Sequence, residues 1–265
     1  MGAVRVVRRW LGVMAAVSAL ALTAPTGQPA AATPAGTQSY LQFNMCGNQC
    51  NHGGLAVVRN LEQTIGGDRP VAVTLNEVCE NQYDRLRRDL SGYRGGFDPT
   101  GPRCDNGTRY GNAVFVRGSG LDTVGSWQLP NPGSDETRRL MCVRGRPALV
   151  VCVTHISFVA ENIGVQVDAV AGILRGLRGD GPVLLGGDFN TDPTDTRLDP
   201  VYSRRREADS AVNHTTFARR KIDYIFLADG YWTAARAAVV DAGRGLSDHG
   251  ALLATALVTD GDRNP

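Results

Sequence analysis

The sequence predicts a mixed α/β layered sandwich made of one domain. Short, nearly continuous apolar runs are typical of strands buried on both faces. Amphipathic runs with helical spacing lie between them, but strands outnumber helices and many connections are short enough for hairpins. This pattern favours layered sheets over a strict βαβ alternation. Once an N-terminal segment is set aside, about 230 residues remain, enough for one large core.

The expected elements follow from these runs in chain order. We interpret seven apolar runs as strands: Ser39–Met45, Val71–Leu75, Ala113–Val116, Ala148–Thr154, Val183–Leu185, Ile222–Leu227 and Ala251–Val258. Apolar residues three or four apart predict helices over Leu55–Ile65 and Asn162–Leu177, with a shorter one over Gln82–Leu90. Ser91–Tyr110 is rich in Gly, Pro and Asp, and we expect a loop there.

The first 32 residues are predicted to be a secretory signal peptide. Three arginines precede a short apolar core, and a small-residue run, Ala30–Ala32, supplies an Ala-x-Ala cleavage site. The alternative is a membrane anchor, but the apolar run is well short of the roughly 20 residues that span a bilayer. We therefore expect an extracellular protein without a transmembrane anchor, with a flexible leader at 33–38, a catalytic domain at 39–260 and a disordered tail at 261–265.

The charge balance gives no sign of a polyanion-coating protein. The chain has 28 basic and 26 acidic residues, and the predicted signal peptide holds three of the arginines and no acid. The exported part is thus close to neutral, whereas nucleic-acid-coating domains are strongly basic. Catalysis on a phosphodiester stays possible, because local arginines and a metal can supply the charge.

Six cysteines follow the signal peptide, and an even number in an exported chain predicts disulfides. Six cysteines allow 15 connectivities. Cys46 and Cys50 are close enough to close a small loop, and Cys142 and Cys152 flank a hairpin-like turn. This arrangement would leave Cys79 to pair with Cys104.

Polar side chains follow most of the predicted strands. A lone carboxylate is costly to bury unless it has a partner, so several such groups suggest a shared cation and a shared anionic substrate. For any one residue a turn or cap is an equally good explanation. The residues at or near strand ends are Asn44, Glu77, His155, Asp188, Asn190, Asp223, Asp248 and His249.

These residue types suit one chemistry. Glu77, Asn44 and Asp248 offer oxygen ligands for Mg²⁺, with Mn²⁺ or Ca²⁺ as alternatives. Asp188 and Asn190 can orient a water or a phosphate oxygen beside such a metal. His249 and His155 can move protons or donate to a phosphoryl oxygen. Asp223 can hold His249 in one tautomer.

The chain resembles the endonuclease/exonuclease/phosphatase superfamily. The motifs that carry the resemblance are Asn44, Asn76-Glu77, Tyr110–Val114, Thr154–Ser157, Gly187–Asn190, Ile222–Ile225 and Ser247–His249, in the family's order. The resemblance implies a four-layer α/β/β/α sandwich with two central mixed sheets. It implies Glu77 as principal metal ligand, assisted by Asn44 and Asp248.

The resemblance also implies roles for the other residues. His249, paired with Asp223, would be the catalytic imidazole, and Asp188 and Asn190 would position the nucleophile and the scissile phosphate. His155 resembles a second histidine of deoxyribonuclease- and sphingomyelinase-like members, but the sequence shows no acid partner for it. The substrate would contact Asn112, together with Arg109 and Tyr110.

Three functions are compatible with the sequence. A secreted nuclease acting on DNA, or also RNA, comes first, and six loop arginines are candidates for backbone contacts: Arg103, Arg109, Arg138, Arg139, Arg144 and Arg146. A lipid phosphodiesterase comes second and would need an apolar loop at the membrane, for which only Trp127–Pro132 is a candidate. A non-catalytic binding module on the same scaffold comes last. We expect a monomer.

Overall fold

The computed structural model describes residues 36–133, 136–146, 149–177 and 181–259, which belong to one compact unit. The predicted signal peptide and the predicted tail lie outside the described residues. The predicted leader is wrong at its end, because strand β1 (Thr37–Asn44) already includes Thr37 and Gln38. These two residues pair with Leu257 and Ala256 at the far end of β12, whose apolar run is long enough to extend the ladder.

The first sheet has six strands in the order β11-β12-β1-β2-β4-β3. The pair β1 and β2 is parallel, and the other neighbours are antiparallel. Helices α1 and α2 follow β1 and β2 in the chain. Besides β1, the bounds are α1 Ala56–Asp68, β2 Ala72–Cys79, α2 Glu80–Asp89, β3 Tyr93–Arg103, β4 Arg109–Arg117, β11 Trp232–Val240 and β12 Ala251–Val258.

The second sheet also has six strands, in the order β5-β6-β7-β8-β10-β9. Here β7 and β8 are the parallel pair, joined through α3. The bounds are β5 Leu121–Gln128, β6 Arg139–Gly145, β7 Leu149–His155, α3 Ala160–Gly176, β8 Val183–Asp188, the 3₁₀ helix Thr196–Leu198, α4 Asp199–Tyr202, β9 Arg205–Glu207 and β10 Asp223–Ala228.

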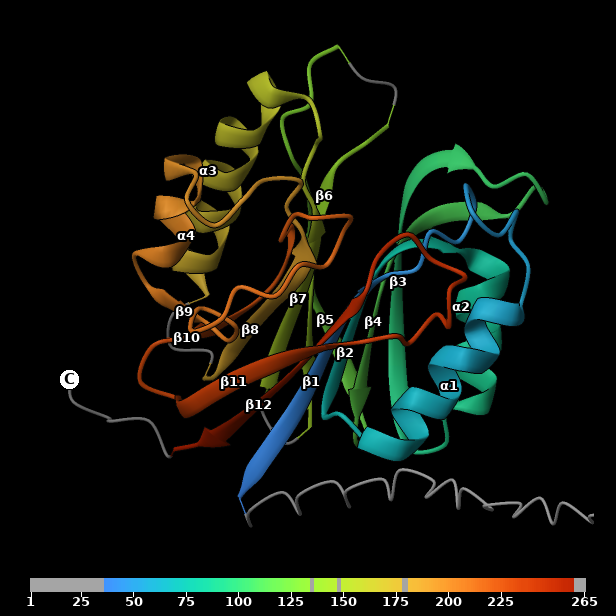
Figure 1. Cartoon of the computed structure of the whole chain (residues 1–265), viewed down its shortest axis with the longest axis horizontal. Coiled ribbons are helices and arrows are strands. Elements are labelled where there is room, and N and C mark those ends of the chain that lie inside the picture. Colours follow the sequence, from blue (N-terminus) through green and yellow to red (C-terminus); the bar gives the residue numbers. More distant parts are fainter. Residues whose placement is uncertain (1–35, 134–135, 147–148, 178–180, 260–265) are drawn as a thin grey trace, which may run out of the picture. The chain divides into compact units, whose positions relative to one another are not determined.

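Three apolar cores separate four layers, as the resemblance implied. One core packs α1 and α2 on the first sheet, around Leu61 and Phe115. A second fills the space between the sheets, around Tyr40 and Val151. The third packs α3 and α4 on the second sheet, around Phe226. Figure 1 shows the two helix pairs on opposite sides of the sheets, which confirms the α/β/β/α sandwich.

The elements that the sequence did not predict are mainly the edge strands. The strands β3, β11, β5 and β9 end the two sheets. An edge strand is paired on one side only and is partly exposed, so it lacks a long apolar run. The stretch expected as a loop over Ser91–Tyr110 therefore contains β3, in which buried residues such as Asp98 alternate with exposed ones.

Three disulfides join Cys46–Cys50, Cys79–Cys104 and Cys142–Cys152, and no described cysteine is free. The expected pairing is confirmed. Two of these bridges lie close to candidate site residues at strand ends, since Cys46 is two residues after Asn44 and Cys79, the last residue of β2, is two residues after Glu77. Within the described part of the chain, no helix combines the length and the apolarity needed to cross a bilayer.

Candidate active site

The two parallel strand pairs deliver the candidate residues to one place. The register of β1 and β2 ends at Asn44 opposite Asn76, and that of β7 and β8 ends at His155 opposite Asp188. Ligands bind beyond the carboxyl ends of parallel strands in open α/β sheets, because several strand ends converge there. Here the carboxyl ends of parallel strands in both sheets contribute side chains to the same cavity.

Asn76 ties the two sheets together beneath this site and is fully buried. Its Oδ1 accepts from Gln42 Nε2 (2.7 Å) and from the Asp188 backbone N–H (3.0 Å). Its Nδ2 donates to the Thr154 carbonyl (2.9 Å) and to Asn112 Oδ1 (2.9 Å). All four hydrogen-bonding positions of the amide are thus used. The Asn76 side chain therefore links strand ends of the first sheet to strand ends of the second.

Glu77 reaches the cavity because its strand is irregular there. The pairing of β2 with β4 shifts between Leu75 and Val78, and Glu77 has a φ of +56°. A bulge of this kind re-aims a side chain, and a positive φ outside glycine is a strained conformation that concentrates at functional sites. Asn44 Nδ2 donates to Glu77 Oε1 at 3.0 Å, which fixes the carboxylate.

His249 is held as an oriented imidazole. Its Nδ1 lies 2.8 Å from Asp223 Oδ2, and the ring of Phe217 packs against it with centroids 4.7 Å apart. Burial lowers the pKa of His249, but the Asp223 hydrogen bond and the charges of Asp223, Asp188 and Asp248 together raise it to about 9. The ring is therefore an imidazolium near neutral pH, and the expected pairing of His249 with Asp223 is present.

Asp188 lies between both histidines. Its Oδ2 is 3.5 Å from His155 Nε2 and 3.7 Å from His249 Nε2, and it accepts a hydrogen bond from Asn44 Nδ2 at 3.1 Å. Burial and then the charge of Asp223 raise the pKa of Asp188 to about 7. This carboxylate is the acid neighbour of His155 that the sequence did not reveal, because the two meet across the β7–β8 ladder.

His155 and Asn190 complete this group. Asn190 Nδ2 lies 3.2 Å from His155 Nε2 and donates to the Ile156 carbonyl at 2.9 Å, while the Asn190 backbone N–H donates to Asp188 Oδ1 at 2.9 Å. Burial lowers the pKa of His155 well below its usual value, and the charges of Arg138 and His249 lower it further. His155 is therefore neutral where His249 is charged, so the two imidazoles are suited to different roles.

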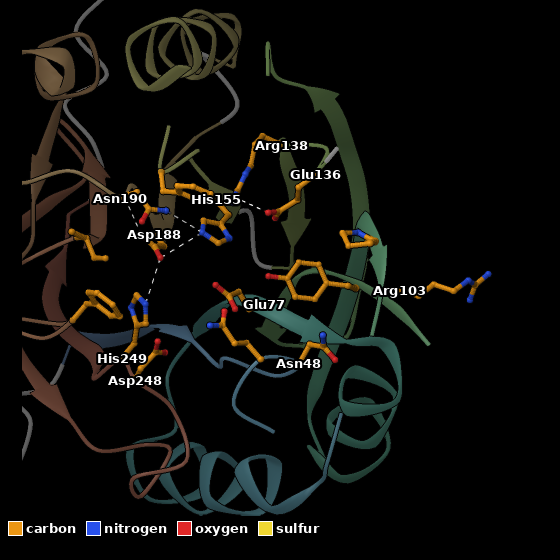
Figure 2. Close-up of a pocket in the computed structure, with 16 residues that line it drawn as sticks. Asn48, Glu77, Arg103, Glu136, Arg138, His155, Asp188, Asn190, Asp248 and His249 are labelled. Atoms are coloured by element: carbon orange, nitrogen blue, oxygen red, sulfur yellow. Dashed lines mark hydrogen bonds and ion pairs between the residues drawn. The ribbon is translucent and has the colours of Figure 1, made fainter. Parts of the chain in front are cut away.

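These side chains surround a cavity of about 410 Å³ (Figure 2). Glu77, Asp188, His155 and His249 face one another across it, and Asp248 lies beside His249. The predicted Tyr110 also lines the cavity. Burial, followed by the charge of Glu77, raises the pKa of Tyr110 well above its usual value, so it is a neutral hydrogen-bonding phenol.

Arg138 and Glu136 line this cavity, although the sequence analysis treated Arg138 only as one of six loop arginines and predicted no role for Glu136. Arg138 is 3% exposed and donates to Glu136 Oε2 at 2.8 Å. In the described part of the chain its Nε and Nη1 have no hydrogen-bond partner. Burying a guanidinium with unused donors is costly unless an anion binds there. In the sequence, the only indication of their role was an acid and an arginine two residues apart, Glu136 and Arg138, just before β6.

Two residues predicted to contact the substrate, Asn112 and Arg109, do not line the cavity. Asn112 is buried, does not line the cavity, and accepts a hydrogen bond from Asn76. Arg109 lies at the surface, where its Nε donates to Glu80 Oε2 at 2.9 Å. Arg109 is next to Tyr110 on β4, so strand alternation puts it on the opposite face, where it meets Glu80. Asn112 shares the face of Tyr110 but is buried against Asn76.

Several other arginines expected to contact a phosphate backbone are paired within the protein. Arg139 binds Asp98 at 3.1 Å, and Arg146 binds Asp122 at 3.0 Å. Arg103 lies at the cavity rim but extends away from Asp188 and His155 in Figure 2. Arg138 is the arginine that the fold directs to the reactive groups.

The donor set of the cavity fits a divalent cation. Four carboxylates line it, those of Glu77, Glu136, Asp188 and Asp248, against two guanidinium groups. Burial raises the pKa of Glu136, while the Arg138 charge opposes this rise and the Glu77 charge adds to it. A hard cation with oxygen ligands would offset the negative charge of the carboxylates. Glu77 and Asp248 are the ligand candidates that line the cavity, whereas Asn44 is buried and its Oδ1 accepts from the Cys46 N–H at 3.0 Å.

The chain belongs to the Endonuclease/Exonuclease/phosphatase family, whose sequence profile matches residues 41–249. It is similar in fold to the catalytic domain of human Nocturnin, with a TM-score of 0.68 and 17% identity over 84% of this chain and 95% of that one. No curated protein sequence matches significantly.

Two bacterial structures are similar to the same extent. An endonuclease/exonuclease/phosphatase from Bacteroides vulgatus has a TM-score of 0.65 and 18% identity, over 84% of this chain and 99% of that one. A mannosyl-6-phosphatase from Bacteroides thetaiotaomicron has a TM-score of 0.63 and 18% identity, over 82% and 98%. At these identities the likeness shows the fold. The family is one of metal-dependent phosphoester hydrolases, and its members differ in substrate.

Proposed function

We propose that this chain is a secreted, divalent-metal-dependent nuclease that hydrolyses DNA phosphodiester bonds. The observation that carries the proposal is geometric: the Nε2 atoms of His155 and His249 lie 3.5 Å and 3.7 Å from the same Oδ2 of Asp188. Burial lowers the pKa of His155, whereas the Asp223 hydrogen bond and neighbouring acids raise that of His249. A phosphodiester needs a proton for its leaving oxygen and a hydrogen-bonded water as nucleophile, and these are different tasks for two groups. A second histidine beside the catalytic one is also the feature that resembles deoxyribonuclease- and sphingomyelinase-like members, both of which cleave phosphodiesters.

Each cavity residue has a proposed role in this reaction. Glu77 and Asp248 would hold Mg²⁺, with Asn44 fixing Glu77, and the metal would supply Lewis-acid stabilisation of a phosphoryl oxygen. Asp188 and Asn190 orient the attacking water. His249, charged and held by Asp223, donates to oxygen atoms that gain charge. The unused Nε and Nη1 donors of Arg138 bind phosphate oxygens, the geometry for which a guanidinium is suited.

Export is supported by two features. The three disulfides are of the kind that persists in oxidising compartments and is rare in the cytosol. The N-terminal segment has the charge and apolar pattern of a signal peptide. We propose that the exported protein acts as a monomer on a nucleic acid, without a membrane anchor.

The lipid alternative required an exposed apolar loop, for which the sequence offered only Trp127–Pro132. Trp127 packs against the core between the second sheet and α3, and Leu129 is 1% exposed. An apolar loop that enters a membrane has to be exposed. The non-catalytic alternative has less support still, because a cavity that gathers two histidines, Asp188 and Arg138 is costly to maintain without a reaction.

A nicking assay tests this function. We expect residues 33–265 to nick supercoiled plasmid in Mg²⁺, and EDTA or His249→Ala to abolish nicking while the variant keeps the wild-type melting temperature. Plasmid that stays intact with the wild-type protein would contradict the nuclease assignment. Sphingomyelin would then be the next substrate, under the same EDTA and His249→Ala controls.

A further inference from the structure

Phe158 is exposed at the edge of the catalytic cavity. It is 72% exposed, and it is the one aromatic among the four large hydrophobic side chains exposed in the described part of the chain. The same side chain lines the cavity. Leaving a phenylalanine in water forgoes the favourable free energy of burying its ring. A single apolar side chain in this position therefore needs an explanation.

The exposure of Phe158 is built into the fold. The residue follows β7 and precedes α3, and the chain on both sides of it is anchored. The Ile156 N–H donates to the Asp188 carbonyl at 2.8 Å, and the Ser157 N–H donates to Gln166 Oε1 at 2.8 Å. The Val159 N–H donates to Ser157 Oγ at 3.1 Å. The loop therefore presents the ring at a fixed place, three residues after His155.

The catalytic cavity has an apolar part in addition to its carboxylates, guanidinium groups and histidines. Phe217, Ile222 and Pro102 line it together with Phe158, and Phe217 covers one face of the His249 ring. A phosphate ester group alone would need only the charged part. The apolar residues indicate that the substrate carries a planar or apolar group close to the phosphorus.

The charges argue against a long polyanion held by its backbone. Each phosphate of a duplex that a protein tracks is matched by a lysine or arginine. Here Arg109, Arg139 and Arg146 are paired with acids of the protein, and the cavity carries more carboxylates than guanidinium groups. These arginines and the cavity therefore do not form a basic array for a phosphate backbone. Stacking of bases on aromatic side chains is a source of affinity that needs no basic array.

We infer that Phe158 is a stacking platform for an unpaired nucleobase next to the scissile phosphate, and that the preferred substrate is single-stranded nucleic acid. The inference rests on the proposed nuclease function and deepens it. A base inside a duplex is stacked on its neighbours and must be flipped out before it can contact an exposed ring. In a single strand each base already offers a face to Phe158.

The test compares two single-stranded oligonucleotides of one length, one with bases and one in which abasic sites flank the cleaved bond. We expect the wild-type enzyme to cleave the base-containing strand with the higher kcat/KM, and to prefer it over the same sequence in a duplex. Phe158→Ala should lower the ratio of kcat/KM on the two strands about tenfold, mainly through KM on the base-containing strand. Phe158→Trp should retain the ratio.

Val212→Ala is the matched control, because Val212 is 64% exposed and does not line the cavity. Its ratio should equal that of the wild type. An equal loss on both strands for Phe158→Ala would mean that the ring only shapes the loop, and no loss would also overturn the inference. So would faster cleavage of the duplex.

Two further outcomes separate the inference from the function on which it rests. If the wild-type enzyme cleaves neither strand nor duplex, the nuclease function and the inference fall together. If it binds phosphatidylcholine–sphingomyelin vesicles and Phe158→Ala abolishes that binding, Phe158 is a membrane contact and the inference is wrong. Cleavage by the wild-type enzyme with an unaltered ratio in Phe158→Ala sinks the inference alone.

Discussion

Two buried groups of charges lie close together at the start of β10, and they differ in what surrounds them. The cavity cluster consists of Asp188, Asp223 and His249, with ligand atoms within 4.8 Å of one another. The Lys221 cluster consists of Glu207, Asp209 and Lys221, and none of its residues lines the catalytic cavity.

In the Lys221 cluster each acid has a cation within direct reach. Lys221 Nζ lies 3.0 Å from Asp209 Oδ2 and 3.3 Å from Glu207 Oε1, and His214 Nδ1 lies 2.6 Å from Asp209 Oδ1. In the cavity cluster Asp188 is 3.7 Å from His249, beyond a good hydrogen bond, and it faces the cavity. Burial is common to both clusters. Partner count does not separate them, because among the described residues Glu207 Oε2 lacks a hydrogen-bond partner while both Asp188 oxygens accept one. Position beside the open cavity distinguishes the functional acid from the structural ones.

Asp188→Asn should give the largest effect, because it tests the functional side of this comparison. The change keeps the shape but removes the charge between His155 and His249, so we expect kcat on plasmid DNA to fall about 10³-fold, roughly 4 kcal/mol in the barrier. The melting temperature should stay level or rise, since a buried carboxylate near Asp223 is removed. Asp122→Asn, at an exposed ion pair on β5, is the control. Full activity in Asp188→Asn would remove Asp188 from the reaction.

Lys221→Met should give the opposite result. It leaves Glu207 and Asp209 buried near each other with no ammonium group, and breaking such a pair costs about 3–5 kcal/mol. Urea unfolding should show this loss, while kcat of the folded enzyme falls less than tenfold. The control is Arg146→Met, because the exposed pair of Arg146 with Asp122 contributes about 1 kcal/mol at most. Unchanged stability with lost activity would assign the Lys221 cluster to the active site.

The sequence predicted the interior of this fold better than its edges. Central strands such as β7 and β8 are apolar throughout and end in His155 and Asp188, so their sequence shows both the strand and its polar end. Edge strands such as β3 have no such pattern. The disulfides were predictable because Cys46–Cys50 and Cys142–Cys152 are local, and only one pairing then remained.

Site residues could be predicted from the sequence where they lie at the end of a strand. They could not be predicted where their position depends on a contact with another part of the chain. Arg109, Tyr110 and Asn112 are neighbours on β4, and nothing in their order shows that only Tyr110 lines the cavity. The acid neighbour of His155 is Asp188, which lies on another strand. Arg138 lines the cavity because packing buries its side chain there. These facts depend on pairing register and packing, which a residue pattern does not contain.

Arg109→Ala should give the smallest effect and tests that distinction. Arg109 is half-exposed and its guanidinium is paired with Glu80 on α2, so the change should leave the melting temperature nearly unchanged, because exposed ion pairs contribute little to stability. Because the side chain does not line the cavity, kcat/KM on single-stranded DNA should stay within about twofold of the wild type, as for other surface changes away from a site. Arg138→Gln, measured in parallel, should lower kcat/KM at least tenfold, because it removes charged donors that have no other partner. A large loss in Arg109→Ala would mean that the substrate extends over α2 and displaces Glu80 from Arg109, and the sequence-based expectation for Arg109 would then be right.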